Sequence, residues 1–433
     1  MSSLITLHSS FLDVNVDIAY PQEYNALTKY ARWFNVSLKA ILAITAMALL
    51  ILGLEAGAMA ANGKAEARGI WVVRTDVISP EKIKASIKYA VDNNFNLLVV
   101  QVRGRGDAFY NSHFEPRAEA LEGQPADFDP LKMYVEEGHK AGLQIFAWLN
   151  THYSWSSEQL PKSPEHVVNK HPEWLMRTAK GELTMVGGGE TEGAYTCPSN
   201  PDVKEHVKNC FLDVVKNYDV DGINFDYVRY PNPDYCFCDG CLARFKALMD
   251  KEISADQIAT LSASKDRLAY TQAFPAKYDQ FRRDNITDLV GQIYRGTKAL
   301  KPKVLVTADV FPESNDAYNR RFQDWKLWMK TGIMDILIPM AYAEDTETWT
   351  KHVADEMTAR NGRLIYAGLG QWRFSAESCI EKIKKGRELG ADGFCLFAYG
   401  SATKGGTDDE YLKKIKAAVF QQPVPVPKAD WLK

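Results

Sequence analysis

Residues 221–231 read Asp-Gly-Ile-Asn-Phe-Asp-Tyr-Val-Arg-Tyr-Pro. The first six are a short apolar run with alternating character, which predicts a buried strand. With a period of two, Ile223 and Phe225 share one face and Asn224 and Asp226 share the other. If helices cover the outside of a closed barrel, the apolar pair faces the helices. Asp226 then points inward at the carboxyl end of the strand.

The same arrangement repeats along the chain after residue 60. Eight short apolar runs are expected to be strands: 69–74, 96–103, 143–150, 219–226, 303–309, 333–342, 363–369 and 393–399. Helical spacing, with Pro in first turns and Gly at ends, marks segments between them, including 80–93, 130–141, 201–218, 278–300 and 376–389. This alternation predicts an α/β fold, a (β/α)8 TIM barrel, with long loops after strands three (151–198) and four (227–280).

An open doubly wound sheet is the structural alternative. It would require a Gly-rich phosphate-binding turn after its first strand, and the sequence has none there. Gly187-Gly188-Gly189 lies in a long loop without a preceding strand, so a flexible turn is the better interpretation.

Composition narrows the function classes. The 433 residues are 46% hydrophobic and 25% charged, which is typical of a folded globular protein. Lys plus Arg total 52 against 55 Asp plus Glu, a net charge of -3. This near balance argues against nucleic acid as a partner.

The N-terminal 60 residues resemble a secretory signal. A basic lead ending at Lys39 precedes an uncharged, mostly apolar run over 40–54, and Ala58-Met59-Ala60 supplies a small-x-small cleavage site. The run is shorter than the roughly 20 residues that span a bilayer, so no stable membrane span is expected after cleavage; an uncleaved anchor is the alternative. We therefore expect export to the periplasm or the cell exterior.

The expected domain boundaries follow from these segments. Residues 1–60 form the signal peptide, residues 61–420 form the barrel, and residues 421–433 form a Pro-rich tail that reads as a disordered end.

Polar side chains gather where the predicted strands end, which is where a TIM barrel holds its active site. The positions are Asp76, Arg103, Asp107, Asn150, Asp226, Asp309, Tyr342, Trp372 and Tyr399. A single strand-end carboxylate can simply cap a loop or pair with an arginine. Several that converge on one rim favour a catalytic site.

Glycoside cleavage requires two carboxyl groups: one protonates the leaving oxygen, and the other attacks the anomeric carbon or activates water. Alternation delivers Asp226 and Asp309 to the same rim. We assign Asp226 as the nucleophile or base and Asp309 as its partner acid, with Asp107, Glu313 and Glu344 as reserves.

The other polar residues would serve the carboxylates or the substrate. Arg103 and Arg229 would keep Asp226 ionised, because a nearby positive charge favours the carboxylate. Asn150 and Tyr342 would bind hydroxyls or stabilise developing charge. The expected substrate-binding set is completed by Asp107, Trp372 and Tyr399.

Aromatic residues near the strand ends also fit a carbohydrate, because the C–H faces of sugars stack on rings. Any one of them could be ordinary packing, Trp148 especially, but as a group they favour a sugar-binding mouth. The nine are Trp148, Tyr153, Trp155, Tyr195, Tyr227, Tyr230, Tyr342, Trp372 and Tyr399.

Two rival enzyme classes are weakly supported. A metal-dependent hydrolase would gather histidine ligands at strand ends, but no His-x-His occurs on strand one, and His113 and His152 are isolated. A loop hydrogen bond is the better interpretation of His152. No Gly-x-Ser-x-Gly turn is present for a nucleophilic serine.

Seven cysteines occur, and Cys236, Cys238 and Cys241 cluster in the loop after strand four. Their spacing is compatible with a structural zinc, for which Cys197 or a histidine could be the fourth ligand. A disulfide in an exported protein is the equal alternative. No cofactor is expected for catalysis.

Several motifs spread over residues 68–400 match one known family. The most specific are Asp226-Tyr227-Val228-Arg229-Tyr230-Pro231 and Arg103 with Gly106-Asp107-Ala108-Phe109-Tyr110. Others are Arg68-Gly69-Ile70-Trp71, Ala147-Trp148-Leu149-Asn150, Phe281-Arg282-Arg283-Asp284-Asn285 and Met334-Asp335-Ile336-Leu337-Ile338-Pro339. Together they resemble the glycosyl-hydrolase-like family ten.

That resemblance implies a TIM-barrel glycosidase of the bacterial envelope, from a group whose studied relatives cleave peptidoglycan glycan strands stripped of their peptides. The family's aspartate maps to Asp226, its strand-two Arg and Asp to Arg103 and Asp107, and its strand-three Asn to Asn150.

Two features depart from the family pattern: Met340-Ala341 stands before Tyr342 where the family often has Gln, and the cysteine cluster is not general. A chitinase-like mechanism is also disfavoured. The chitinase motif Asp-Gly-x-Asp-x-Asp-x-Glu ends in an acid, and Val228 stands at the corresponding position here.

The sequence therefore predicts an exported glycoside hydrolase that acts on a cell-wall or related polysaccharide, with peptidoglycan glycan strands favoured. A carbohydrate-binding barrel without turnover is the alternative.

Overall fold

The computed structural model describes residues 64–189 and 191–432. The predicted signal peptide, residues 1–60, lies outside the described residues. The barrel and everything packed on it fall within one compact unit, Gly63–Lys433. Among the described helices, none has the length and apolar content to cross a membrane.

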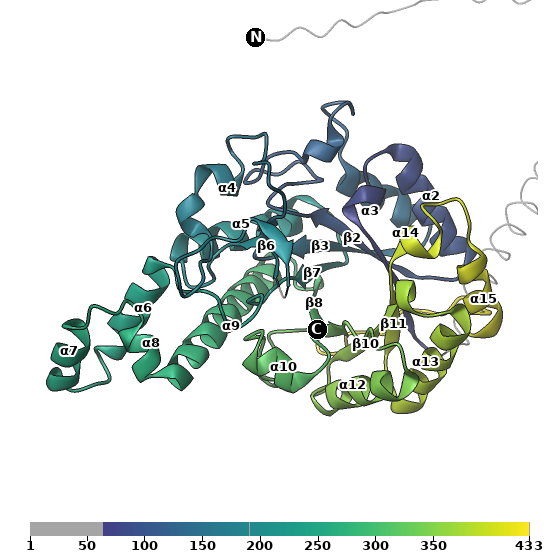
Figure 1. The fold of residues 1–433 in the computed structure, drawn as a ribbon. Coiled ribbons are helices and arrows are strands. Elements are labelled where there is room, and N and C mark those ends of the chain that lie inside the picture. The colour runs from purple at the N-terminus through teal and green to yellow at the C-terminus, as the bar shows by residue number, and fades with distance from the viewer. Residues whose placement is uncertain (1–63, 190, 433) are drawn as a thin grey trace, which may run out of the picture. The chain divides into compact units, whose positions relative to one another are not determined.

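Eight parallel strands close into a barrel in the order β1-β11-β10-β9-β8-β7-β3-β2 (Figure 1). This confirms the predicted (β/α)8 TIM barrel. The strands are β1 Ala67–Val72, β2 Leu97–Arg103, β3 Gln144–Asn150, β7 Gly222–Asp226, β8 Leu305–Val310, β9 Ile336–Pro339, β10 Leu364–Gly370 and β11 Gly393–Phe397.

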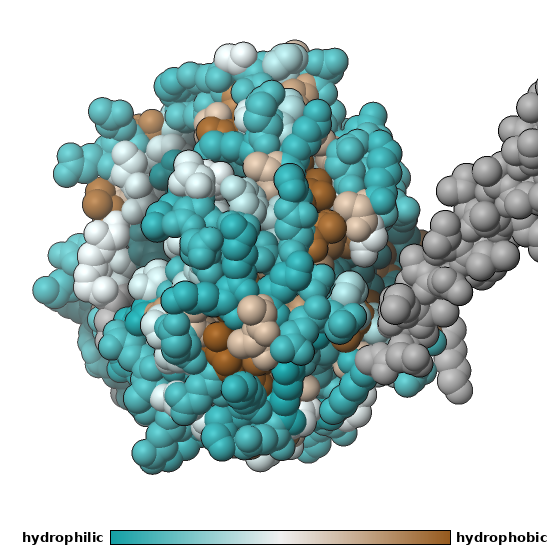
Figure 2. All heavy atoms as spheres, turned by 90° about the vertical axis from the view of Figure 1, so that its right-hand side faces the viewer, coloured by the Kyte–Doolittle hydropathy of each residue, from teal (hydrophilic) through white to brown (hydrophobic). Residues whose placement is uncertain are grey.

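Helices surround the barrel: α2 Pro80–Asp92, α3 Pro130–Lys140, α5 Pro201–Asn217, α9 Pro275–Leu300, α11 Trp325–Thr331, α12 Thr346–Thr358, α13 Ala376–Leu389 and α15 Glu410–Ala418. Their termini follow local chemistry. Ser79 and Asp129 accept hydrogen bonds from backbone N–H groups in the first turns of α2 and α3, and Gly390, with φ of 82°, ends α13. The outer face over α2, α13 and α15 is mostly hydrophilic (Figure 2).

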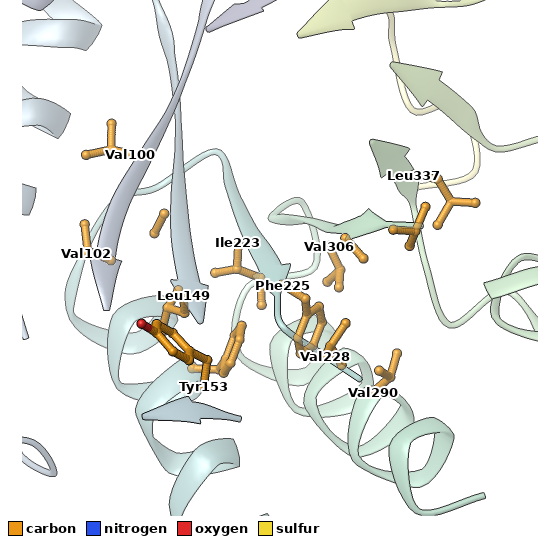
Figure 3. Packing of buried hydrophobic residues seen from close by; sticks show 14 of the residues in the cluster. Val100, Val102, Leu149, Tyr153, Ile223, Phe225, Val228, Val290, Val306 and Leu337 are labelled. Atoms are coloured by element: carbon orange, nitrogen blue, oxygen red, sulfur yellow. The ribbon is translucent and has the colours of Figure 1, made fainter. Parts of the chain in front are cut away.

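Alternation along the strands divides the core into two layers. Outward side chains such as Ile223, Phe225 and Val306 pack against the helices, including Val290 of α9 (Figure 3). Inward side chains fill the barrel itself: Ala67, Trp71, Leu97, Val99, Phe146, Trp148, Leu305, Ile336, Ile338, Leu364, Tyr366, Cys395 and Ala398. The barrel is therefore a packed core whose functional groups lie at its end.

Both predicted long loops contain structure of their own. The loop after β3 holds β4 Tyr153–Trp155, α4 Val167–Lys170, β5 Val186–Gly188 and β6 Thr191–Tyr195, and the strands form a small antiparallel sheet in the order β4-β6-β5. The loop after β7 holds α6 Asp239–Met249, α7 Ala255–Ser262 and α8 Ala269–Ala273, and short helices α10 Ser314–Asn319 and α14 Tyr399–Ala402 follow β8 and β11.

The prediction of a disordered C-terminal end is wrong. Trp431 and Leu432 pack against the residues that fill the barrel, and the Trp431 indole N–H donates to Asp335 at 2.8 Å. Asp335 precedes β9, so this contact lies at the amino end of the barrel. The tail closes the end opposite the predicted site, because its apolar residues gain a buried surface there.

Candidate active site

Asp226 and Asp309 lie on neighbouring strands and face the barrel interior, as alternation predicts. Phe225 of β7 pairs with Ala308 of β8, so the two aspartates stand side by side at the carboxyl ends of their strands. Asn224, one inward position deeper on β7, donates to Asp309 Oδ2 at 2.8 Å. Asp226 is 6% exposed and Asp309 is 2% exposed.

The turn after β7 supports the Asp226 carboxylate. Tyr227 has a left-handed backbone with φ of 51°, which a non-glycine residue adopts only when its surroundings enforce it. The turn brings the Tyr227 N–H to Asp226 Oδ1 at 2.6 Å. Trp148 donates its indole N–H to Asp226 Oδ2 at 3.2 Å, so this tryptophan does more than fill space.

The two carboxyl groups have different electrostatic environments. Burial raises the pKa of Asp226 to about 6, against the opposing effects of Arg229 and the Tyr227 N–H. Burial raises the pKa of Asp309 well above its usual range, and the neighbouring Asp226 charge adds to the increase. These environments favour the proton on Asp309 and the negative charge on Asp226, the separation of roles that acid–base chemistry uses.

Arg229 and Glu192 extend the charged network, and Glu192 is a residue that the sequence reasoning missed. Arg229 Nη1 lies 3.6 Å from Asp226 Oδ1, and its Nη2 donates to Glu192 Oε1 at 2.9 Å. The Glu192 side chain is 39% exposed. Because Glu192 lies on β6, inside the loop inserted after β3, no strand-end pattern marks it.

Asn150 is close to the site, but its amide is already used by the protein. Its Oδ1 accepts from Trp148 at 3.0 Å and Gln101 at 3.3 Å, and its Nδ2 donates to the Gly104 carbonyl at 2.6 Å. Asp107 similarly accepts the Arg105 N–H at 2.7 Å in its own loop. Asn150 pairs with Asp226 across β3 and β7, and its bond to Gly104 connects it to the loop that holds Asp107.

An aromatic wall stands beside the carboxyl pair. Tyr342 packs edge-on against Trp372 with centroids 4.8 Å apart, and Phe397 contacts both rings as well as Trp71 and Trp148. Burial and the negative charge of the adjacent Asp309 raise the pKa of Tyr342, so the Tyr342 hydroxyl lies within the electrostatic influence of the carboxyl pair. Trp372 is 49% exposed, so its ring is available to a ligand. We call Tyr342, Trp372 and Phe397 the aromatic wall.

The other predicted aromatics do not complete a single ring. Tyr153, Tyr195 and Tyr227 form a second cluster, with Tyr153 and Tyr227 stacked at 4.7 Å. Trp155 instead stacks under Arg105, and Tyr230 is buried against Phe322.

Tyr399 is not part of the mouth, contrary to the prediction. The strand β11 ends at Phe397, and Tyr399 is the first residue of α14. Its ring is 6.1 Å from Tyr89 of α2, in the outer core. The strand ends two residues before the predicted end at Tyr399. Phe397 is therefore the last inward-facing residue of β11, the place that the alternation predicted for Tyr399.

Arg103 also departs from its predicted role beside Asp226. It is 1% exposed and donates to Glu115 at 2.5 Å and to the carbonyl of Asn150. The pairing of β2 with β3 shifts register between Gln101 and Arg103, a bulge that redirects the side chain. Gln101 takes the inward place, where it accepts from the Arg74 N–H at 3.1 Å.

The reserve acids Glu313 and Glu344 are exposed. His152 is fully buried, and burial lowers its pKa to about 3; its Nδ1 contacts Thr196 Oγ1 at 3.3 Å. The loop hydrogen bond expected for His152 is therefore confirmed. The structure brings Cys236, Cys238 and Cys241 together with Cys197 from the other long loop.

This architecture defines a class: a closed (β/α)8 barrel with carboxyl groups and aromatic rings at the carboxyl end, as in TIM-barrel glycosidases. The catalytic domain of β-amylase from Paenibacillus polymyxa has the same fold, with a TM-score of 0.59 at 13% identity over 83% of this chain and 99% of that chain. The chain belongs to the family Glycosyl hydrolase-like 10, whose model matches residues 66–367.

Two curated relatives agree with this membership. The chain is 26% identical to "Glycosyl hydrolase YngK" of Bacillus subtilis (strain 168) over 65% of its length, and 24% identical to "Glycosyl hydrolase DigH" of Escherichia coli (strain K12) over 66%. It spans 55% and 64% of the lengths of those relatives, respectively.

Proposed function

We propose that this protein is an exported glycoside hydrolase that cleaves O-glycosidic bonds in a cell-wall or related polysaccharide, with peptidoglycan glycan strands as the favoured substrate. The main support is the pairing of Asp226 with Asp309 at the barrel mouth, where two carboxyl groups in contrasting environments lie under the aromatic wall. The family membership and the names of YngK and DigH point to the same class.

In the proposed mechanism Asp226 is the ionised carboxylate and Asp309 the proton donor. The Trp148 and Tyr227 N–H groups hold the Asp226 oxygens in place, and Arg229 stabilises their charge. Asn224 donates to Asp309 Oδ2, and we assign to the other oxygen, Oδ1, the protonation of the leaving group. The exposed Trp372 ring would stack on a sugar unit next to the cleaved bond.

Neighbouring strands favour retention of anomeric configuration. Paired strands lie about 4.8 Å apart, and retaining glycosidases hold their carboxyl groups about 5–5.5 Å apart, whereas inverting enzymes use about 6.5–9.5 Å. Proton NMR of the first-formed anomer tests this. An inverted first product would show that Asp226 does not attack the sugar directly.

The decisive experiment incubates the purified protein with intact and with peptide-free peptidoglycan and analyses the products by mass spectrometry. Asp226→Asn should lower the rate at least about 1000-fold, the scale of a lost nucleophile. Asp309→Asn and Glu192→Gln identify the partner acid, because the true proton donor should show the larger loss. Binding without release of reducing ends would favour a carbohydrate-binding barrel instead.

A further inference from the structure

The geometry points to a structural zinc site made by Cys197, Cys236, Cys238 and Cys241. The zinc would take no direct part in the proposed glycosidase chemistry. It joins the two long loops that border the barrel mouth.

The four sulfurs form one buried cluster. The Sγ atoms of Cys197, Cys236 and Cys238 all lie within 4.8 Å of one another. The Cys241 thiol lies close enough to the other three to interact with each of them, and its Sγ also contacts Tyr278 Oη at 3.2 Å. All four residues are buried. In a tetrahedral site with Zn–S bonds of about 2.3 Å, the sulfurs lie roughly 3.8 Å apart, so the sulfurs of Cys197, Cys236 and Cys238 need only small adjustments and Cys241 would move in as the fourth ligand.

The cluster also has donors for thiolate sulfur. The Cys238 N–H points at Cys236 Sγ at 3.5 Å, and the Cys241 N–H points at Cys238 Sγ at 3.4 Å. Cys238 is the N-cap of the eleven-residue helix α6, whose N-terminal end favours a negative sulfur. Backbone donors of this kind orient metal ligands and stabilise their charge.

Cys197 has its own donor, supplied through a side-chain relay. Ser199 Oγ accepts from Arg244 at 3.1 and 3.2 Å, which leaves the serine proton free for Cys197 Sγ at 3.2 Å. Arg244 and the buried Arg282, which donates to the Tyr235 carbonyl, bring positive charge near a site whose four thiolates would exceed the zinc charge by two.

A second grouping of ligand-type atoms provides an internal contrast. Glu115, His206 and Cys210 also lie within 4.8 Å of one another. There, however, the guanidinium of Arg103 already pairs with Glu115 at 2.5 Å and occupies the place of a cation. Near the four cysteines, Arg244 donates to Ser199 and Arg282 donates to the Tyr235 carbonyl. Neither arginine therefore pairs with the sulfurs as Arg103 pairs with Glu115, and a metal ion can supply the positive charge.

The site would connect two loops that each hold a member of the charged network. Cys197 follows β6, which holds Glu192, and Cys236 lies on the loop that begins at Tyr227 and holds Arg229. Zinc would therefore fix the distance over which Glu192 and Arg229 pair. Its role would be structural, because four sulfur ligands leave no open position for a substrate or water.

The test measures metal content and thiol state of the full-length protein. Mass spectrometry of the metal should find about one zinc per chain. After denaturation with a chelator, alkylation should modify all seven cysteines. Cobalt in place of zinc should give the visible absorption of a tetrahedral thiolate site. A zinc-free protein that takes up neither metal under reducing conditions would overturn the proposal, as would alkylation of only three cysteines, which indicates two disulfides.

Matched variants locate the site. Cys197→Ser and Cys238→Ser should each reduce bound zinc to background and lower the thermal midpoint. Cys379→Ala, at a buried cysteine on α13 away from the cluster, should retain the zinc. Equal zinc content in all three variants would contradict the assignment. If the serine variants do not fold, the wild-type metal content and cobalt spectrum still decide.

Discussion

Asp309 is buried at a position where an ionised carboxylate is strongly unfavourable, because little water reaches it and another carboxylate is adjacent. The pKa of Asp309 in the folded protein lies above the unfolded value of about 3.9. Above about pH 3.9 this group therefore keeps its proton in the folded state while losing it in the unfolded state. The contribution of Asp309 to the free energy of unfolding therefore falls as pH rises from about 4. Each pH unit between the two pKa values corresponds to about 1.4 kcal/mol.

We predict that Asp309→Asn is more stable than the wild type at neutral pH while losing activity. The reason is that the amide never ionises, although it can still accept the Asn224 hydrogen bond. Urea unfolding at several pH values measures this, and the wild-type decline with pH should become shallower in the variant. An unchanged pH dependence would show that Asp309 is not the group being titrated.

Arg103 and Glu115 form a buried ion pair instead of a substrate contact. Burial opposes ionisation of Glu115, but Arg103 and His206 outweigh it and lower its pKa to about 2. We predict that Arg103→Met lowers the free energy of unfolding by about 3–5 kcal/mol at pH 7, because it leaves a buried carboxylate without its main partner. The difference in free energy of unfolding between the wild type and the variant should decrease as pH falls toward 2, where Glu115 becomes protonated in the wild type.

The double variant Arg103→Met with Glu115→Leu is the control for this pair. It should be more stable than Arg103→Met alone, since no unpaired charge remains. If Arg103→Met instead raised KM without lowering the free energy of unfolding, Arg103 would be a substrate-binding residue, as the sequence predicted.

Among the elements, the C-terminal segment after α15 contributes to the barrel. Trp431 places its ring under Arg363, 4.7 Å from the guanidinium carbon, and donates to Asp335, which also pairs with Lys298. We predict that deletion of residues 429–433 destabilises the protein by about 1–3 kcal/mol, because it exposes apolar surface at the closed end of the barrel. Chemical denaturation measures the loss.

Trp431→Phe separates packing from hydrogen bonding. It should cost only about 1 kcal/mol, the size of a single hydrogen bond. An unchanged unfolding midpoint after the deletion would mean that the segment does not support the barrel.

For the whole molecule, the pair of carboxyl groups predicts a bell-shaped pH profile of kcat/KM on the proposed substrate. Activity should rise as pH increases through about 6, since Asp226 must be ionised, and fall at higher pH as Asp309 loses its proton. Glu192→Gln should shift the rising limb to lower pH, because the Glu192 charge raises the pKa of Asp226. A rising limb that does not move would place Glu192 outside this electrostatic network.

Sequence alone was sufficient for the barrel and for the direction of its two principal carboxyl groups. Period-two alternation in a buried strand leaves one choice of face, so Ile223 and Phe225 had to face the helices and Asp226 the interior. The same logic placed Asp309 correctly on β8. These outcomes depend only on local spacing and burial.

Tertiary structure decided what surrounds those groups. A bulge in β2 turned Arg103 away, the early end of β11 replaced Tyr399 by Phe397, and folding of the long loops brought Glu192 to Arg229 and Cys197 to the other cysteines. No periodic pattern in the sequence predicts these contacts. Each depends on where a strand ends or on how a loop packs against residues distant in the chain.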